Sequence, residues 1–251
     1  MSMMLTEKDI WSSKVDFYHE ARPKYHIGPV LQVLSDAPES PVVVELGAGT
    51  GRFTRPLLEQ NNVVVHAVEP NQAMREKLTI TCGPCHNLHI IDATAEETNL
   101  PIGFADLICS ANSAHWFKID AFKKECNRIL KKNGKVILIW DLYAEDAATQ
   151  EYDYLMHNSC ATKNVIDVKG KIDAIILSNF FSEYKKIVYN FDYLYDFSKI
   201  LKLAQSTHCT PIEGEPGYHF MFSKLQEWFN KYQQNGFVKL CYNTTLYKGN
   251  L

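Results

Sequence analysis

Glycines at alternate positions follow a run of β-branched residues early in the chain. Residues 42–46 read Val-Val-Val-Glu-Leu, and Gly47, Gly49 and Gly51 come directly after them. A buried parallel strand is a continuous apolar run, and glycines let the turn that follows it take positive φ and approach a ligand closely. The pattern therefore predicts a nucleotide-binding turn at the end of a strand.

Two acidic residues accompany this turn. Glu45 lies near the end of the first apolar run, and Glu69 directly follows the second, residues 63–68. The G-x-G-x-G spacing is one residue shorter than the G-x-G-x-x-G fingerprint that binds a dinucleotide pyrophosphate. A tighter loop beside a carboxylate favours a ligand with a cationic amino-acid end, and a carboxylate after the second strand can accept hydrogen bonds from both ribose hydroxyls.

Further motifs lie on either side of this unit. They are Tyr18, Arg22-Pro23 and Tyr25, the run Ala93-Thr94-Ala95-Glu96 followed by Leu100-Pro101, and the run Asn112-Ser113-Ala114-His115-Trp116-Phe117. With the glycine loop, they resemble the motifs of the class I S-adenosylmethionine-dependent methyltransferases, in particular the small-molecule branch that includes trans-aconitate methyltransferases. Ala93 stands where that branch usually has glycine. The resemblance covers about residues 11–141.

The resemblance implies S-adenosylmethionine as the cofactor and S-adenosylhomocysteine as its product. Glu45 is expected to face the methionine ammonium group, and Glu69 the ribose. Arg22 could bind the methionine carboxylate as a planar fork, although an arginine before proline can equally be a solvated helix end. The expected cofactor-binding residues are Arg22, Glu45, Gly47, Ala48, Gly49, Gly51, Glu69, Pro70, Met74, Thr94, Ala95 and Asn112.

His115 is the candidate catalytic residue. It follows the predicted strand 105–110, at the edge where the reacting methyl group is expected. An oxygen or nitrogen nucleophile must attack without its proton, and histidine can act as the general base that removes it. The alternative is that His115 packs or hydrogen-bonds to shape the pocket, because a carboxylate acceptor needs no base.

Aromatic residues gather at the predicted strand ends and in the N-terminal segment. They can exclude water, and a dry pocket favours attack by an anion on a sulfonium because the opposite charges cancel in the transition state. An apolar small molecule is therefore a plausible acceptor, although aromatic residues are also ordinary core. The expected substrate-binding residues are Tyr18, His115, Trp116, Trp140 and Tyr143.

Alternating strand and helix patterns from 42 to 141 predict a parallel sheet with right-handed crossovers. We expect an α/β fold, a Rossmann-like seven-stranded, mostly parallel sheet whose last strand is antiparallel, with helices on both faces and a helical lid. Strands are predicted at 42–46, 63–68, 87–91, 105–110, 135–140, 184–192 and 237–248. Helices are predicted at 27–34, 71–80, 145–160 and 219–234, with a further one in the N-terminal segment ending near Arg22-Pro23 and another stopping at Asn133-Gly134. We expect one domain over 1–251, with an N-terminal cover at 1–38, a cofactor-binding core at 41–141, a lid and substrate region at 145–236 and a final strand at 237–249.

Composition narrows the class of partner. The 251 residues carry 26 basic and 29 acidic side chains, a net charge of −3, without the basic patch that a phosphate backbone requires. We therefore expect a small-molecule acceptor, no nucleic acid and no membrane, a cytoplasmic location, and a monomer or homodimer. The seven cysteines fit buried thiols in a reducing compartment better than a disulfide framework.

Several alternatives stay open. A protein or nucleic-acid methyltransferase would share the cofactor half, and a non-catalytic S-adenosylmethionine-binding regulator would share it without turnover. Cys82-Gly83-Pro84-Cys85 spells a thioredoxin-type redox motif, and with His86 and His89 it could be drawn as a zinc site. The motif leads into a strand rather than a helix N-terminus, so redox function is disfavoured. His89 lies inside the predicted strand, which gives poor geometry for zinc, and no metal is expected.

Overall fold

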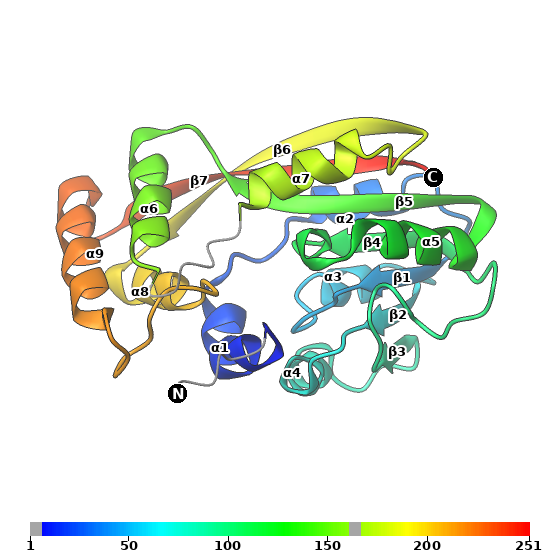
Figure 1. Cartoon of the computed structure of the whole chain (residues 1–251), viewed down its shortest axis with the longest axis horizontal. Helices are drawn as coiled ribbons and strands as arrows, with labels where there is room; N and C mark the ends of the chain where they lie inside the picture. The colour runs from blue at the N-terminus through cyan, green and yellow to red at the C-terminus, as the bar shows by residue number, and fades with distance from the viewer. Residues whose placement is uncertain (1–6, 161–166) are drawn as a thin grey trace. The chain divides into compact units, whose positions relative to one another are not determined.

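The computed structural model describes residues 7–160 and 167–251. The first six residues of the predicted cover and residues 161–166 of the predicted lid lie outside the described residues. The strands form one seven-stranded sheet in the order β3-β2-β1-β4-β5-β7-β6 (Figure 1). They are β1 (Val42–Leu46), β2 (Val64–Val68), β3 (Leu88–Ile91), β4 (Ala105–Ala111), β5 (Leu130–Tyr143), β6 (Glu183–Tyr195) and β7 (Val238–Asn250).

The direction of the strands confirms the predicted fold class. β1 pairs in parallel with β2 and β4, β2 with β3, and β4 with β5. β7 runs opposite to its neighbours β5 and β6, so the parallel part of the sheet is closed by an antiparallel strand (Figure 1). The helices are α1 (Glu7–Ala21), α2 (Ile27–Leu34), α3 (Thr54–Leu58), α4 (Gln72–Cys82), η1 (Ala114–Trp116), α5 (Ile119–Ile129), α6 (Ala147–Asn158), α7 (Val168–Leu177), α8 (Phe197–Gln205) and α9 (Tyr218–Tyr232).

The chain divides into two compact units. Of the described residues, unit 1 contains 7–23, 141–160 and 190–243, and unit 2 contains 24–140, 167–189 and 244–251. Unit 2 therefore carries β1 to β4, most of β5, α2 to α5, η1 and α7. Unit 1 carries α1, α6, α8 and α9 with the far ends of the three long strands.

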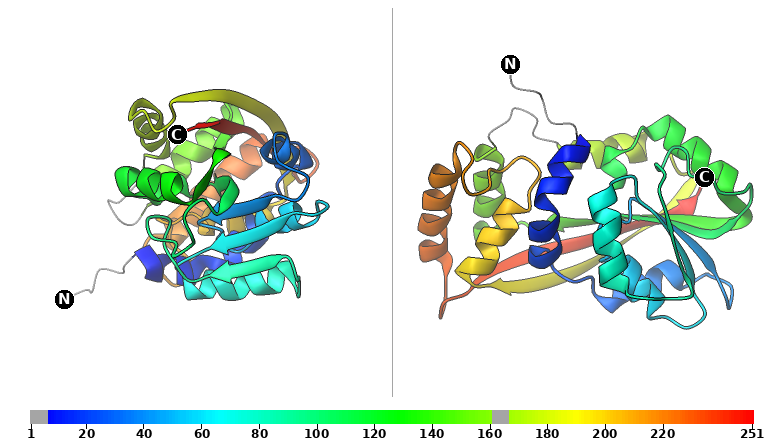
Figure 2. Two further views of the ribbon diagram at one scale, coloured as in Figure 1. Left: turned by 90° about the vertical axis from the view of Figure 1, so that its right-hand side faces the viewer. Right: turned by 90° about the horizontal axis from the view of Figure 1, so that it is seen from below.

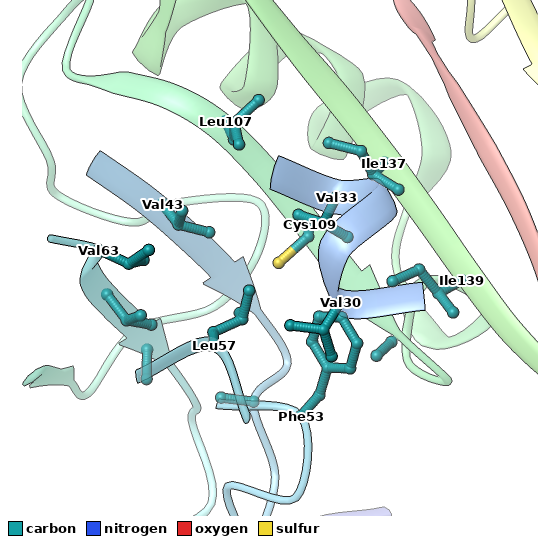
Figure 3. Packing of buried hydrophobic residues seen from close by; sticks show 14 of the residues in the cluster. Val30, Val33, Val43, Phe53, Leu57, Val63, Leu107, Cys109, Ile137 and Ile139 are labelled. Atoms are coloured by element: carbon teal, nitrogen blue, oxygen red, sulfur yellow. The ribbon is translucent and has the colours of Figure 1, made fainter. Parts of the chain in front are cut away.

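The core of unit 2 explains why its strands are apolar throughout. Side chains on one face of the sheet, among them Val43, Leu107, Cys109 and Ile137, pack with Val30 of α2 and are fully or almost fully buried (Figure 3). Figure 2 shows α2 and α5 on opposite faces of these strands. Because helices cover both faces, neither face needs the polar alternation of a half-exposed strand.

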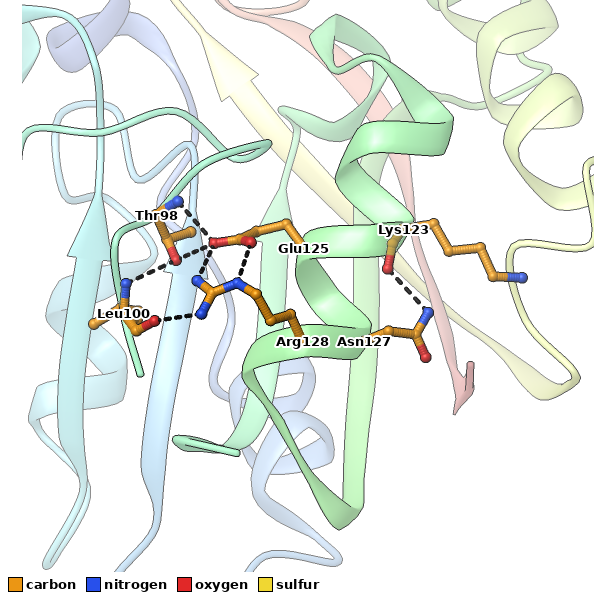
Figure 4. A network of polar contacts seen from close by, with 6 residues as sticks. All are labelled: Thr98, Leu100, Lys123, Glu125, Asn127 and Arg128. Carbon is orange, nitrogen blue, oxygen red and sulfur yellow. Dashed lines mark hydrogen bonds and ion pairs between the residues drawn. The ribbon is translucent and has the colours of Figure 1, made fainter. Parts of the chain in front are cut away.

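A buried carboxylate, paired with a partly exposed arginine, fixes α5 to the loop before β4. Glu125 accepts hydrogen bonds from the backbone N–H and hydroxyl of Thr98, at 2.8 and 2.5 Å, and from two guanidinium nitrogens of Arg128, at 2.7 and 2.8 Å (Figure 4). Arg128 also donates to the carbonyl of Leu100 at 2.7 Å. The Arg128 hydrogen bond lowers the pKa of Glu125 to about 2, with the Thr98 bonds adding to the effect against burial.

The predicted end of the helix before β5 is wrong. α5 ends at Ile129, and β5 begins at Leu130 rather than at 135. Leu130 pairs with Ala105 and Lys135 with Leu107, so Asn133-Gly134 lies in an irregular stretch of the strand instead of stopping the helix. Sequence patterns also missed α7 and α8, whereas the range predicted for α2 is confirmed.

Unit 1 has its own core and a disulfide. Tyr152, Leu203, Met221 and Trp228 are among the buried residues that its helices bring together. The expectation of thiols throughout is wrong for two cysteines, because Cys160 and Cys209, 49 residues apart, are joined. Cys82, Cys85, Cys109, Cys126 and Cys241 are free. No helix within 7–160 or 167–251 combines the length and apolar character needed to cross a membrane.

Candidate functional site in unit 2

The three loop glycines have different reasons to be glycine. Gly47, Gly49 and Gly51 have φ of 70°, 57° and 79°, a region that disfavours side chains. A Cβ at Gly47 would come within 2.6 Å of Ser113 Cβ, and one at Gly51 within 3.0 Å of Leu78 Cγ. A Cβ at Gly49 would meet nothing within 4 Å. Packing therefore excludes side chains at the outer two glycines, whereas Gly49 borders open space.

Glu69 ties the glycine loop to the end of β2. Its carboxylate accepts the N–H of Gly49 and the N–H of Asn71, each at 2.9 Å. Burial raises the pKa of Glu69, and these two backbone hydrogen bonds oppose the rise. A carboxylate has about four lone-pair sites, so the two donors leave acceptor capacity for the ribose hydroxyls expected here.

Glu45 points into the interior on the α3 side of the sheet. It is 1% exposed and accepts a hydrogen bond from the hydroxyl of Thr54 at 2.6 Å. Burial raises its pKa to about 8, with the charge of Glu69 adding and the Thr54 bond opposing. A nearby cation would offset this cost and favour the carboxylate, which is the property needed to bind an ammonium group.

A buried hydroxyl in the same loop lacks a partner. Thr50 is 1% exposed, and its Oγ1 has no hydrogen-bond partner among the described residues. Buried polar atoms are nearly always bonded, so an orphaned one is a sign of an absent ligand or water. Open space at Gly49, spare acceptor capacity on Glu69 and the orphaned hydroxyl together fit a polar nucleoside at this loop.

The predicted adenine-side residues lie around the start of α4 and after β3. Asn71 caps α4 by accepting the N–H of Met74 at 3.0 Å, and Met74 is buried whereas Pro70 is exposed. Thr94 is exposed and Ala95 is buried, in a short turn after β3.

One ion pair in this region was missed from the sequence. Arg75 binds Asp92 through two hydrogen bonds, at 2.9 and 2.7 Å, and also donates to the carbonyl of Glu69 at 2.9 Å. Arg75 thus joins the ends of β2 and β3. The signal was available, because Asp92 directly follows a strand, as Glu69 does.

The segment after β4 is attached to the glycine loop. Asn112 has φ of 54° and donates from Nδ2 to the hydroxyl of Tyr25 at 2.7 Å. Ser113, which the sequence did not single out, donates its hydroxyl proton to the carbonyl of Gly47 at 2.8 Å. The position of η1, which carries His115, therefore depends on the glycine loop.

His115 is held by a tryptophan from the next strand. Trp140 of β5 is fully buried, and its indole N–H donates to Nδ1 of His115 at 3.2 Å. The ring of Trp116 lies 5.4 Å from that of His115. The structure thus brings together three of the predicted substrate-binding residues.

The remaining predicted site residues belong to unit 1. Arg22 donates from Nε to the hydroxyl of Ser206 at 3.2 Å, and its guanidinium lies 5.6 Å from the ring centre of Tyr18. Burial opposes the charge of Arg22, yet neighbouring tyrosines, Tyr143 first among them, raise its pKa. The ring of Tyr143 packs at 5.1 Å from that of Tyr242. Arg22 is the only expected cofactor-binding residue outside unit 2.

The cysteine motif is not arranged for redox chemistry. Cys82 is the last residue of α4, and burial raises its pKa to about 12. A thiol held protonated is a poor nucleophile. Across the part of the chain that the structure describes, no group of three or more His, Cys, Asp or Glu side chains could hold a metal ion.

Comparison with known proteins supports a methyltransferase core within unit 2. Residues 44–138 match a methyltransferase domain family. An uncharacterised methyltransferase-like protein of Schizosaccharomyces pombe is 32% identical over 143 residues, 55% of this chain and 54% of that protein. The chain spans about half the length of the curated relatives it matches.

Solved structures share the fold. A structure described as a putative type II methyltransferase from Anaeromyxobacter dehalogenans has a TM-score of 0.66 at 17% identity, covering 91% of this chain and 97% of that one. A methyltransferase from Geobacter sulfurreducens, solved with S-adenosylhomocysteine, has a TM-score of 0.54 at 10% identity, covering 95% and 98%. Both support the Rossmann-like sheet, and neither addresses the trans-aconitate branch.

Proposed function

We propose that this protein transfers a methyl group from S-adenosylmethionine to an oxygen, or less readily a nitrogen, of a small metabolite. The observation that carries the proposal is the loop between β1 and α3: Gly49 borders open space and donates its N–H to the buried Glu69, and the buried Glu45 lies in the strand that leads into the loop. The methyltransferase family match over 44–138 includes this loop, and the Geobacter sulfurreducens neighbour was solved with the product of such a cofactor.

In this proposal the candidate cofactor-binding residues of unit 2 have defined tasks. Glu45 faces the methionine ammonium, and Glu69 accepts the ribose hydroxyls while its backbone donors hold it in place. The other proposed cofactor contacts are Gly47, Ala48, Gly49, Gly51, Pro70, Met74, Thr94, Ala95 and Asn112. The cofactor supplies an activated methyl group on a sulfonium, and the residues around His115 exclude water from it.

We propose cofactor or acceptor roles for three residues of unit 1 as well. Arg22 is a candidate for the methionine carboxylate, and Tyr18 and Tyr143 are candidates for contacts with the acceptor. The basis in unit 1 is its clustering of Tyr18 and Tyr143 near the arginine.

Calorimetric titration with S-adenosylhomocysteine tests the cofactor half. We expect micromolar affinity, about −8 kcal/mol. Absence of heat with a folded protein would reject the proposal. Incubation of the protein with methyl-labelled S-adenosylmethionine and a small-metabolite extract, followed by mass spectrometry, tests the transfer, and the expected result is one product heavier by one methyl group.

Label on protein or nucleic acid in the same reaction would favour the other methyltransferase class. Tight binding with no labelled product of any kind would favour a cofactor-binding regulator. The net charge of −3 supports the small-molecule acceptor over nucleic acid, whose phosphates require an excess of basic side chains.

A further inference from the structure

The hydrogen bond between Trp140 and His115 determines where the imidazole carries its proton. An indole N–H can donate and cannot accept. Trp140 is fully buried, so its N–H needs an acceptor, and it donates to Nδ1 of His115 at 3.2 Å. Nδ1 is therefore unprotonated, and the single proton of the neutral ring lies on Nε2.

This assignment changes what His115 can do. A general base needs an unprotonated nitrogen facing the acceptor, but the unprotonated nitrogen of this ring is occupied by the indole. The other nitrogen presents an N–H, which can donate a hydrogen bond and cannot receive a proton. The sequence left open whether His115 is a base or shapes the pocket. The hydrogen bond from Trp140 favours a role for His115 as a hydrogen-bond donor rather than as a base.

The neighbouring contacts fix this arrangement in place. Ser113, two residues before His115, is bonded to the carbonyl of Gly47, and Ile139, the residue before Trp140, pairs with Ala111 at the end of β4. These contacts hold the backbone on either side of the hydrogen bond, and the full burial of Trp140 limits the room in which its ring could turn.

We propose that Trp140 is a positioning residue that fixes His115 as a hydrogen-bond donor, and that the acceptor therefore arrives with an oxygen that is already an anion. The inference rests on the proposed methyltransferase function. In the transfer, the acceptor oxygen forms a bond to the methyl carbon, and the carbon–sulfur bond breaks with its electron pair going to sulfur. The acceptor's negative charge and the sulfonium's positive charge cancel, so no proton moves and no base is required.

The hydrogen bond between Trp140 and His115 can be tested in the absence of a methyl acceptor. In full-length protein labelled with ¹⁵N on tryptophan and histidine, Trp140→Phe and His115→Leu identify the signals of the two rings. We expect an unprotonated Nδ1 in His115 and an upfield shift of the Trp140 indole proton in His115→Leu. A proton on Nδ1 of His115 would overturn the assignment, whatever the enzyme's activity.

The donor role is tested by a pair of variants. In His115→Gln, the amide oxygen can accept from Trp140 while the amide nitrogen donates where Nε2 did, but the side chain cannot act as a base. With methyl-labelled S-adenosylmethionine and a small-metabolite extract as the source of acceptor, we expect His115→Gln to stay within about tenfold of the wild-type rate. His115→Leu should lose about 100-fold when the acceptor is below saturation, because it loses the hydrogen bond to a charged oxygen that binds and orients the acceptor.

Equal losses in His115→Gln and His115→Leu would show that a base is needed and would overturn the proposal. Trp140→Phe should lower turnover while leaving S-adenosylhomocysteine affinity unchanged, and loss of that affinity would make Trp140 a cofactor residue instead. Failure of the wild-type protein to bind S-adenosylhomocysteine would count against the proposed function. The measurement of the His115 tautomer does not depend on that binding, so the two failures can be told apart.

Discussion

Both units bury an ionisable side chain, but they satisfy it in different ways. In unit 2, Glu45 is bonded to Thr54, which lies close to it in the sequence. In unit 1, Lys14 is 4% exposed and donates to the carbonyls of Gln205, Thr207 and Thr210, near the other end of the chain. Burial lowers the pKa of Lys14 to about 8, with the charge of Glu215 opposing.

The difference shows why one unit has a readable motif and the other does not. A short strand-loop-helix segment contains the acid, its partner and the glycines of unit 2, so its chemistry follows from adjacent residues. One continuous segment, 24–140, makes up most of unit 2, whereas unit 1 is assembled from three segments of more similar length. Its polar contacts form only when those segments meet in the folded protein. No pattern of neighbouring residues in the sequence therefore predicts them.

The disulfide is expected to produce the largest effect, confined to unit 1. Closing a loop of 49 residues lowers the entropy of the unfolded chain, which corresponds to about 4 kcal/mol. Cys160→Ser should therefore lower the free energy of unfolding by that order, measured by urea titration. Cys241→Ser, which alters a free thiol, is the control. If Cys160→Ser leaves the free energy of unfolding unchanged, the disulfide contributes nothing to stability.

A side chain at Gly49 should affect binding in unit 2 nearly as strongly. Gly49→Leu would fill the open space beside Glu69 and weaken S-adenosylhomocysteine at least about 100-fold, about 2.7 kcal/mol. Gly103→Leu is a matched control, because Gly103 also has positive φ, 62°, and open space around its Cβ. If both variants lose affinity equally, backbone strain at a positive φ, and not filling of the space beside Glu69, would explain the loss.

The Glu125 network should have a smaller effect, on the stability of unit 2. Glu125→Gln replaces a carboxylate that Thr98 and Arg128 bond, and should cost about 2 kcal/mol, the range for a hydrogen bond to a charged group. The folded pKa of about 2 lies below the ordinary value of 4.5. The unfolded state therefore binds more protons between these values, and the contribution is full above pH 4.5 and lost as the pH falls toward 2.

Urea titrations of the wild-type protein and Glu125→Gln at pH 7 and pH 4 check this. The two proteins should differ less at the lower pH. A constant difference would mean that the charge of Glu125 does not contribute.

The smallest effect is expected on the pH dependence of cofactor binding. Because the pKa of Glu45 is raised to about 8 by burial, its carboxyl is mostly protonated below that pH. Binding of an ammonium group requires the carboxylate, so affinity for S-adenosylhomocysteine should rise by about fivefold from pH 7 to pH 8. Glu45→Gln should remove this rise, measured by calorimetry.

Adenosine is the control ligand for this experiment, since it lacks the amino-acid tail. Its affinity should not change over the same range. A rise that persists in Glu45→Gln would assign the titration to another group.

The sequence predicted the local features of this protein. The run Val42–Leu46, the glycines after it and the acids Glu45 and Glu69 identified the strand, the turn and the candidate cofactor loop, because each depends on neighbouring residues. The fold class also followed, since alternating strands and helices allow few topologies. The end of α5 was misjudged because pairing of Leu130 with Ala105 overrides the turn signal of Asn133-Gly134.

Only the tertiary structure decided which side chains meet across the chain. It joined Cys160 to Cys209, Ser113 to Gly47 and Trp140 to His115. The sequence placed His115 at the correct strand end but left its protonation open. A proton's position depends on the hydrogen-bond partner of each ring nitrogen, and that partner comes from a strand distant in sequence and adjacent only in the folded sheet.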